Sequence, residues 1–185
     1  MNQLDITIFR WFNSWAGHSS FVDWTIIFLA EYLWYVMAGA VISLVLSTWF
    51  LRFRQYRKRH LELLYLALVS AFSARFVVAE VIKYIFNRPR PFAVLDGVQQ
   101  LLQHSAGRSF PSGHASLAFA IAATVAFYYP KTSILFFIAA VNVGVARVIA
   151  GVHWPSDILG GALVGIFTAW LAHWIFAPTV NKENG

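Results

Sequence analysis

The chain has 185 residues, a net charge of +6 and a mean hydropathy of +0.61, with 59% hydrophobic and only 12% charged residues. This composition lies outside the range of soluble domains and predicts an integral membrane protein. Cysteine is absent, which excludes disulfides and thiolate metal sites. The length allows five to six spans of about 20 residues. We therefore expect one all-α membrane helix bundle forming a single domain over residues 1–185.

The N-terminal segment places apolar side chains at helical spacing between polar ones, namely Leu4, Ile8, Trp11, Phe12 and Trp15. This pattern predicts a short amphipathic helix in the headgroup layer of a membrane. The next apolar stretch, residues 24–51, contains a single charge, Glu31, and is too long for one untilted span. We therefore expect a break near Glu31 and a full span from about Tyr32.

Four further spans are expected from apolar runs at about 61–86, 114–129, 133–150 and 157–176. Five Lys or Arg residues in the segment 52–60 form the densest basic cluster of a short loop, which predicts the cytoplasmic side by the positive-inside rule. Counting spans from this cluster places the N-terminus, the polar segment 87–111 and the break at 147–157 on the external face.

Three segments with polar side chains, 83–91, 111–114 and 146–157, therefore meet at the external face. They contribute three cations that can surround an anion and two histidines that can act as nucleophile and proton carrier near neutral pH. These side chains are Lys83, Arg90, Arg147, His114 and His153.

The spacing inside two of these segments has a physical meaning. In the segment PSGH, Ser112 can cap the following helix and Gly113 lets the backbone approach a ligand, so the helix N-terminus points at a phosphate. His153 and Asp157 are four residues apart, so on a helical turn Asp157 can accept the Nδ1–H of His153. That hydrogen bond would leave Nε2 free to attack a substrate.

Together these segments resemble the three signature motifs of the type-2 phosphatidic acid phosphatase superfamily, in the order and at the helix ends typical of that family. The matching residues are Lys83-x6-Arg90-Pro91, Pro111-Ser112-Gly113-His114 and Arg147-x5-His153-x3-Asp157. The motif-bearing core covers residues 83–157. One departure is Ala146, where the family usually has serine, so one possible hydrogen bond to phosphate is lost.

The resemblance implies a phosphatase that needs no metal and no other cofactor. It implies that His153 takes the phosphoryl group, that Asp157 orients His153, and that His114 protonates the departing oxygen and later deprotonates water. It also implies that the phosphate oxygens are held by Lys83, Arg90, Ser112, Gly113 and Arg147.

A short single-bundle chain with the segment RPRPF is, within this superfamily, most similar to the bacterial bacitracin-resistance type of undecaprenyl-diphosphate phosphatase. The resemblance implies hydrolysis of undecaprenyl diphosphate to undecaprenyl phosphate at the external face of the bacterial cell membrane, a step of peptidoglycan synthesis. Phosphatidic acid, phosphatidylglycerol phosphate and diacylglycerol pyrophosphate stay open as substrates. Transfer of phosphate to a second lipid and a non-enzymatic lipid-binding or transport module also stay open.

The expected partners are the lipid bilayer and a polyprenyl or glycerolipid phosphate, with no nucleic acid. Two ionisable side chains inside the second span are further candidates. Glu80 lies three residues before Lys83, so it can hold that lysine in place or contact the substrate. For Arg75 a structural role is expected, with Glu31 or a backbone carbonyl as partner. His104 is expected at the surface or the membrane interface.

Overall fold

The computed structural model describes residues 2–182, with side chains described as far as residue 176. All regular secondary structure in this part of the chain is helical. The α-helices are α1 (Gln3–Asn13), α2 (Ser20–Ile27), α3 (Leu33–Ser47), α4 (Arg57–Phe72), α5 (Ala79–Phe86), α6 (Gly113–Tyr128), α7 (Pro130–Ile149) and α8 (Pro155–Lys182). Two π-helical segments, η1 (Phe28–Tyr32) and η3 (Ser73–Val78), and two 3-10 segments, η2 (Leu51–Tyr56) and η4 (Pro91–Ala93), lie between them.

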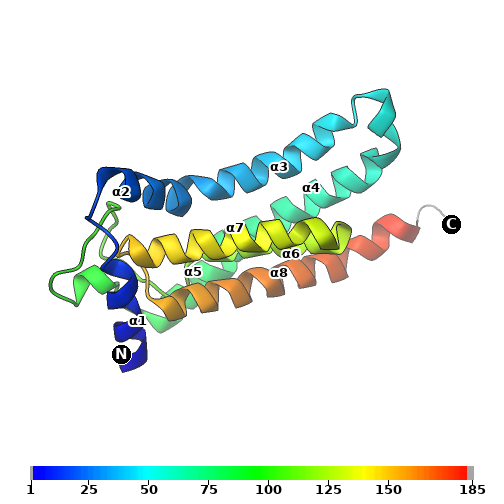
Figure 1. Ribbon diagram of the computed structural model, residues 1–185. Helices are drawn as coiled ribbons and strands as arrows, with labels where there is room; N and C mark the ends of the chain where they lie inside the picture. The colour runs from blue at the N-terminus through cyan, green and yellow to red at the C-terminus, as the bar shows by residue number, and fades with distance from the viewer. Residues whose placement is uncertain (1, 183–185) are drawn as a thin grey trace.

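Four helical stretches of the described chain are long and apolar enough to cross a bilayer, namely Ser20–Ser47, Leu51–Ala93, Pro130–Ile149 and Pro155–Phe176. The remaining predicted span, at about 114–129, is the shorter apolar helix α6. The all-α membrane bundle is confirmed, and the chain is a multi-pass membrane protein. Figure 1 shows α4, α6, α7 and α8 running side by side, with α1 and the segment between α5 and α6 at one end of the bundle.

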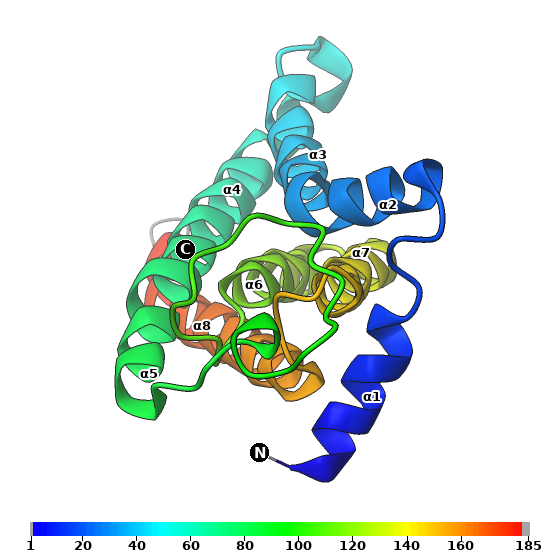
Figure 2. The same ribbon diagram turned by 90° about the vertical axis from the view of Figure 1, so that its left-hand side faces the viewer.

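Helix α6 lies at the centre of the bundle. In Figure 2 the other long helices stand around it and the segment 87–112 passes over its near end. Its packing against α8 is very close, because a Cβ on Gly165 would stand 2.3 Å from the carbonyl oxygen of Ser116. With 16 residues α6 measures about 24 Å, which is less than the roughly 30 Å of the hydrocarbon core. At least one end of α6 therefore lies below the membrane surface.

Helix α1 packs across the end of the bundle where α6 and α8 begin. Its buried side carries Asp5, Phe9 and Asn13, and the Phe9 ring packs at a tilt against Trp154 with 5.3 Å between ring centroids. The Nδ2 of Asn13 donates to the backbone carbonyls of Gln99 and Ile149, at 2.8 Å each. The predicted amphipathic helix is thus present, and it is also held to the bundle by specific side chains.

The expected break near Glu31 is a π-helical segment rather than a loop. Segment η1 contains Glu31, and a second π-helical segment, η3, contains Arg75. A π-helical turn holds an extra residue, which changes the direction of the side chains that follow, and such turns are frequent at functional sites. Both side chains reach His114, the second residue of α6, within 3.5 Å.

Candidate active site

The predicted site residues gather where α7 ends and α6 and α8 begin. His153, in the turn between α7 and α8, and Asp157, in the first turn of α8, are both buried. The Nδ1 of His153 lies 3.3 Å from Oδ2 of Asp157, as their spacing predicts. Asp157 also accepts from the backbone N–H of Trp154 at 2.9 Å and from NH1 of Arg88 at 2.8 Å. Its carboxylate is therefore fixed in orientation by three donors.

The other ring nitrogen of His153 faces Arg90, whose NH1 lies 3.3 Å from Nε2. A guanidinium only donates hydrogen bonds, so Nε2 must be the accepting nitrogen and the ring proton must lie on Nδ1, toward Asp157. Burial lowers the pKa of His153 well below its usual range, and the guanidiniums of Arg147 and Arg90 lower it further. At neutral pH the ring is therefore uncharged, with a lone pair on Nε2.

Beside this nitrogen lie two buried arginines with unpaired N–H groups. Among the described residues, the Nε and NH2 of Arg147 and the Nε of Arg90 are buried without a hydrogen-bond partner. Arg147 is completely buried and Arg90 is 4% exposed. As a guanidinium, Arg90 stays charged at neutral pH. Each unmet buried donor costs about 1–3 kcal/mol, a cost that a bound phosphate would remove.

His114 has partners on both ring nitrogens. Its Nδ1 lies 3.3 Å from NH1 of Arg75, and its Nε2 lies 3.5 Å from Oε2 of Glu31. Because Arg75 can only donate, the ring proton of neutral His114 lies on Nε2, the reverse of His153. The other oxygen of Glu31, Oε1, accepts from NH1 of Arg147 at 2.8 Å. Glu31 thus connects one candidate proton carrier to one candidate phosphate ligand.

The N-terminus of α6 lies beside the cationic side chains of Arg75 and Lys83. Ser112 is the N-cap residue of α6, as predicted. A Cβ on Gly113 would stand 3.0 Å from NH1 of Arg75, so glycine leaves room for that side chain, and Nζ of Lys83 lies 3.7 Å from the same position, an ordinary contact distance. The expected pair of Glu80 and Lys83 is present, with 2.6 Å between Oε1 and Nζ.

One expectation needs correction. Glu31 or a backbone carbonyl is the expected partner of Arg75, but the carboxylate of Glu31 binds Arg147 and His114, and Arg75 contacts His114. Glu31 and Arg75 lie in different helices, each in a π-helical segment, and both reach α6.

His104, expected at the surface or the membrane interface, is half-buried. Burial together with Arg90 and Arg147 lowers its pKa to about 4.

Sequence reasoning also missed Arg88 and Asp5. Arg88 donates from NH1 to Ser156 Oγ at 2.6 Å as well as to Asp157, and its NH2 forms an ion pair with Asp5. Asp5 also accepts from the backbone N–H of Ser156 at 3.0 Å. Arg88 belongs to the segment RPRPF, so its position near Arg90 could have indicated a role at the site. No sequence pattern indicated a role for Asp5.

Comparison with known proteins identifies the family of this chain. Residues 62–180 match the PAP2 superfamily. The chain is 32% identical over 181 residues to the bacitracin transport permease protein BcrC of Bacillus licheniformis, covering 97% of this chain and 84% of that protein. It is 31% identical over 168 residues to the undecaprenyl-diphosphatase BcrC of Bacillus subtilis, covering 91% and 82%.

Among solved structures, the crystal structure of Aquifex aeolicus LpxE is similar, with a TM-score of 0.72 and 28% identity. The match covers 92% of this chain and 95% of that one. Sequence and structure therefore agree along nearly the whole chain, and the chain belongs to the PAP2 superfamily, as its three motifs indicate.

Proposed function

We propose that this protein removes the terminal phosphate of an isoprenoid lipid diphosphate, with undecaprenyl diphosphate as substrate and undecaprenyl phosphate as product. The observation that carries the proposal is the uncharged Nε2 of His153 beside the unpaired buried donors of Arg90 and Arg147. The substrate is taken from the relative in Bacillus subtilis, which is named an undecaprenyl-diphosphatase and matches over most of its length. One domain spanning residues 1–185 performs the reaction.

In the first step the Nε2 lone pair of His153 forms a bond to the terminal phosphorus. The bond between that phosphorus and the bridging oxygen breaks, and the bridging oxygen leaves with the electron pair as lipid monophosphate. The imidazolium form of His114, which the carboxylate of Glu31 stabilises, donates a proton to this departing oxygen and becomes the neutral ring. Asp157 stabilises the positive charge that develops on the ring of His153, and Arg90 and Arg147 stabilise the phosphoryl oxygens.

In the second step water attacks the phosphorus of the phosphohistidine. His114, now the neutral ring, accepts a proton from that water. The P–N bond breaks, its electron pair returns to Nε2 of His153, and inorganic phosphate leaves. Ser112, the N–H of Gly113 and Lys83 complete the set of donors around phosphate, and Glu80 holds Lys83 in position.

Other lipid phosphates are the alternative substrates. Relatives of this chain include a lipid A 1-phosphatase of Rhizobium johnstonii, so a glycerolipid or saccharolipid phosphate is a second candidate. The same phosphohistidine could transfer its phosphate to a lipid hydroxyl instead of water. Measuring phosphate release and lipid products together separates these reactions.

The first experiment is phosphate release by purified protein in detergent, with a metal chelator present, from undecaprenyl diphosphate and from phosphatidic acid. We expect metal-independent release that prefers the diphosphate. His153→Ala should lower the rate by about 10⁴-fold or more. A matched control is His18→Ala, because His18 is exposed and its ring contacts only the carbonyl of Ser14 among the described residues. Unchanged release by His153→Ala would refute the proposed nucleophile.

We further propose that the site lies on the external face of a bacterial cell membrane. The proposal rests on the basic segment 52–60, which is expected on the cytoplasmic side. The absence of cysteine makes this easy to test with single cysteines introduced at His104 and Lys58. A membrane-impermeant thiol reagent added to intact cells should label the cysteine at position 104 and not that at position 58. Labelling at position 58 alone would reverse the orientation.

A further inference from the structure

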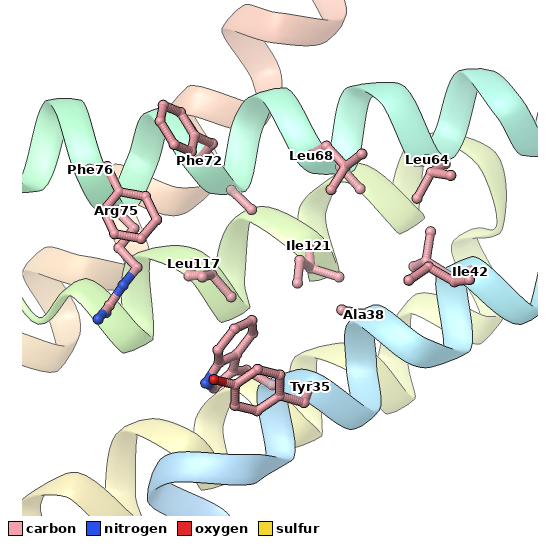
Figure 3. Close-up of a pocket in the computed structure, with 14 residues that line it drawn as sticks. Tyr35, Ala38, Ile42, Leu64, Leu68, Phe72, Arg75, Phe76, Leu117 and Ile121 are labelled. Atoms are coloured by element: carbon pink, nitrogen blue, oxygen red, sulfur yellow. The ribbon is translucent and has the colours of Figure 1, made fainter.

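An apolar groove of about 390 Å³ runs between α3 on one side and α4 and η3 on the other, with α6 beneath it (Figure 3). Its floor is made of buried side chains, among them Ala67 and Leu117. Its rim is exposed, with Tyr35 at 57% and Phe72 at 60%. In a membrane protein such an exposed apolar rim faces lipid chains, so a lipid can enter the groove from the side.

One end of the groove carries a cation. Of the described residues that line it, only Arg75 is charged. Figure 3 shows the Arg75 side chain beside Phe76, reaching past Leu117 toward the start of α6. There its NH1 lies 3.3 Å from Nδ1 of His114. The groove therefore leads from the lipid-facing side of the bundle to the candidate active site.

Charge on Arg75 needs an explanation, because an ionised side chain within a span is expensive unless it is paired. In the described part of the chain no carboxylate forms a direct ion pair with Arg75, although Glu31 and Glu80 are near enough to act on its charge. Its guanidinium contacts the ring of His114 and the ring of Phe76, 5.3 Å from the guanidinium carbon. A guanidinium has five N–H donors in a planar fork, which suits phosphate oxygens. Most of these donors are available to a ligand.

We propose that Arg75 binds the phosphate group attached to the lipid chain, the one that leaves, while the groove holds the first units of that chain. This inference rests on the proposed function. When a diphosphate is cleaved, the leaving group is itself a charged phosphate, and it departs on the side of His114, which gives it a proton. Arg75 lies on that side, whereas Arg90 lies at His153.

When a lipid monophosphate is cleaved, the leaving group is an uncharged alcohol. Such a leaving group has no phosphate oxygens for Arg75 to bind. Arg75 is thus a specificity-determining residue that favours diphosphates over monophosphates. The bond-breaking step is the one given above, and Arg75 adds only charge stabilisation of the leaving phosphate.

The test compares farnesyl diphosphate with farnesyl monophosphate, two substrates that share one chain and differ by one phosphate. Arg75→Leu should lower kcat/KM for the diphosphate by about 30-fold or more and for the monophosphate by less than about 3-fold. Arg75→Lys, which keeps the charge, should recover part of the activity on the diphosphate. Arg108→Leu is the matched control, because Arg108 is an exposed arginine that stacks on Tyr84.

Equal losses of Arg75→Leu on both substrates would overturn the inference, since Arg75 would then act through His114 on every substrate. Full activity on the diphosphate would overturn it as well. If Arg75→Leu does not fold, the smaller change Arg75→Gln carries the same comparison. Wild-type protein that releases no phosphate from either substrate would instead refute the proposed function itself.

Two alanines of α3 provide a matched pair of variants that test the groove. Ala38 lines the groove and is half-buried, whereas Ala40 is exposed and does not line it. Ala38→Phe should raise KM for farnesyl diphosphate by about 10-fold, because the added ring occupies the space of the chain, while Ala40→Phe should change KM by less than about 2-fold. Hydrolysis of the chainless substrate p-nitrophenyl phosphate should be equal in both variants. Equal KM values for farnesyl diphosphate would show that the chain lies elsewhere.

Discussion

Two groups of basic side chains occupy opposite ends of this bundle, one around His60 and one around His153. The ring of His60 is buried and paired on both nitrogens, with Nδ1 2.7 Å from the carbonyl of Leu44 and Nε2 2.6 Å from the hydroxyl of Tyr129. Arg59 donates to the carbonyl of Tyr128 and stacks on Tyr129, 4.4 Å from the ring centroid. Every one of these interactions is internal to the protein.

The group around His153 is different. Arg147 and Arg90 keep buried donors without a partner in the described part of the chain, and Nε2 of His153 presents a lone pair. Folding normally pairs buried polar atoms, so unpaired donors clustered beside a histidine mark a place for a ligand. The comparison shows that burial of basic residues does not by itself identify a site. A cluster of unpaired donors on two guanidiniums does, whereas a single unpaired nitrogen, such as Nδ1 of His173 beside Tyr128, does not.

The largest difference between the two ends is expected in kcat/KM when one arginine is replaced at each end in separate variants. Arg147→Met should lower kcat/KM for lipid diphosphate by about 10³-fold, because a buried donor to the phosphoryl oxygens is lost. Arg59→Met should change kcat/KM by less than about 3-fold, since its hydrogen bond and ring contact hold structure only. Steady-state phosphate release measures both. Similar losses in the two variants would remove the distinction between the two ends.

A phosphate analogue should bind only at the end with unpaired donors and should stabilise the folded protein through them. Orthovanadate at 100 times its Kd should raise the free energy of unfolding of wild-type protein by about 2.7 kcal/mol. In Arg147→Met the gain should fall toward zero, whereas in Arg59→Met it should be kept. Thermal unfolding in detergent, with and without orthovanadate, gives these values. A full gain in Arg147→Met would place the anion elsewhere.

Replacement of His60 should affect stability rather than catalysis. His60→Phe removes both hydrogen bonds of a buried ring, so the hydroxyl of Tyr129 loses its partner while the carbonyl of Leu44 keeps the hydroxyl of Ser47 at 2.6 Å; the change should cost about 2 kcal/mol of unfolding free energy. The kcat of the folded fraction should stay within about 2-fold of wild type. A variant that unfolds at the wild-type temperature, or one that loses kcat, would contradict the structural role of His60.

The last expected effect is a dependence of stability on pH that comes from the site. Because the pKa of His153 is lowered by burial and by Arg147 and Arg90, the unfolded chain binds a proton there more readily than the folded protein. This contribution to stability is present above about pH 6.5 and is lost as the pH falls below it, with a slope of up to about 1.4 kcal/mol per pH unit. Half-buried His104, with its pKa near 4, adds a contribution of the same sign.

Unfolding measured between pH 7.5 and pH 5 tests this dependence. His153→Gln should flatten the slope and leave only the part due to other groups. His104→Gln should flatten it less, because its ring is partly solvated. A slope that does not change in His153→Gln would show that the ring of His153 is not held in the uncharged form.

Features that depend on neighbours along the chain could be predicted from the sequence. Hydropathy gave the spans, because burial in lipid requires long apolar runs. Short spacings gave the contact of His153 with Asp157, the pair of Glu80 with Lys83, and Ser112 as the cap of α6, since a helical turn brings such residues together whatever the rest of the fold does.

Contacts between segments far apart in the chain could not be predicted from the sequence and became visible in the folded structure. Glu31 lies 116 residues from Arg147 and Asp5 lies 151 residues from Ser156, and no local pattern links either pair. The role of Arg75 depends on a π-helical turn and on a glycine at position 113 that leaves space beside it. Such contacts arise from the packing of whole helices around α6, which sets the direction of each side chain and so determines which charges meet at the site.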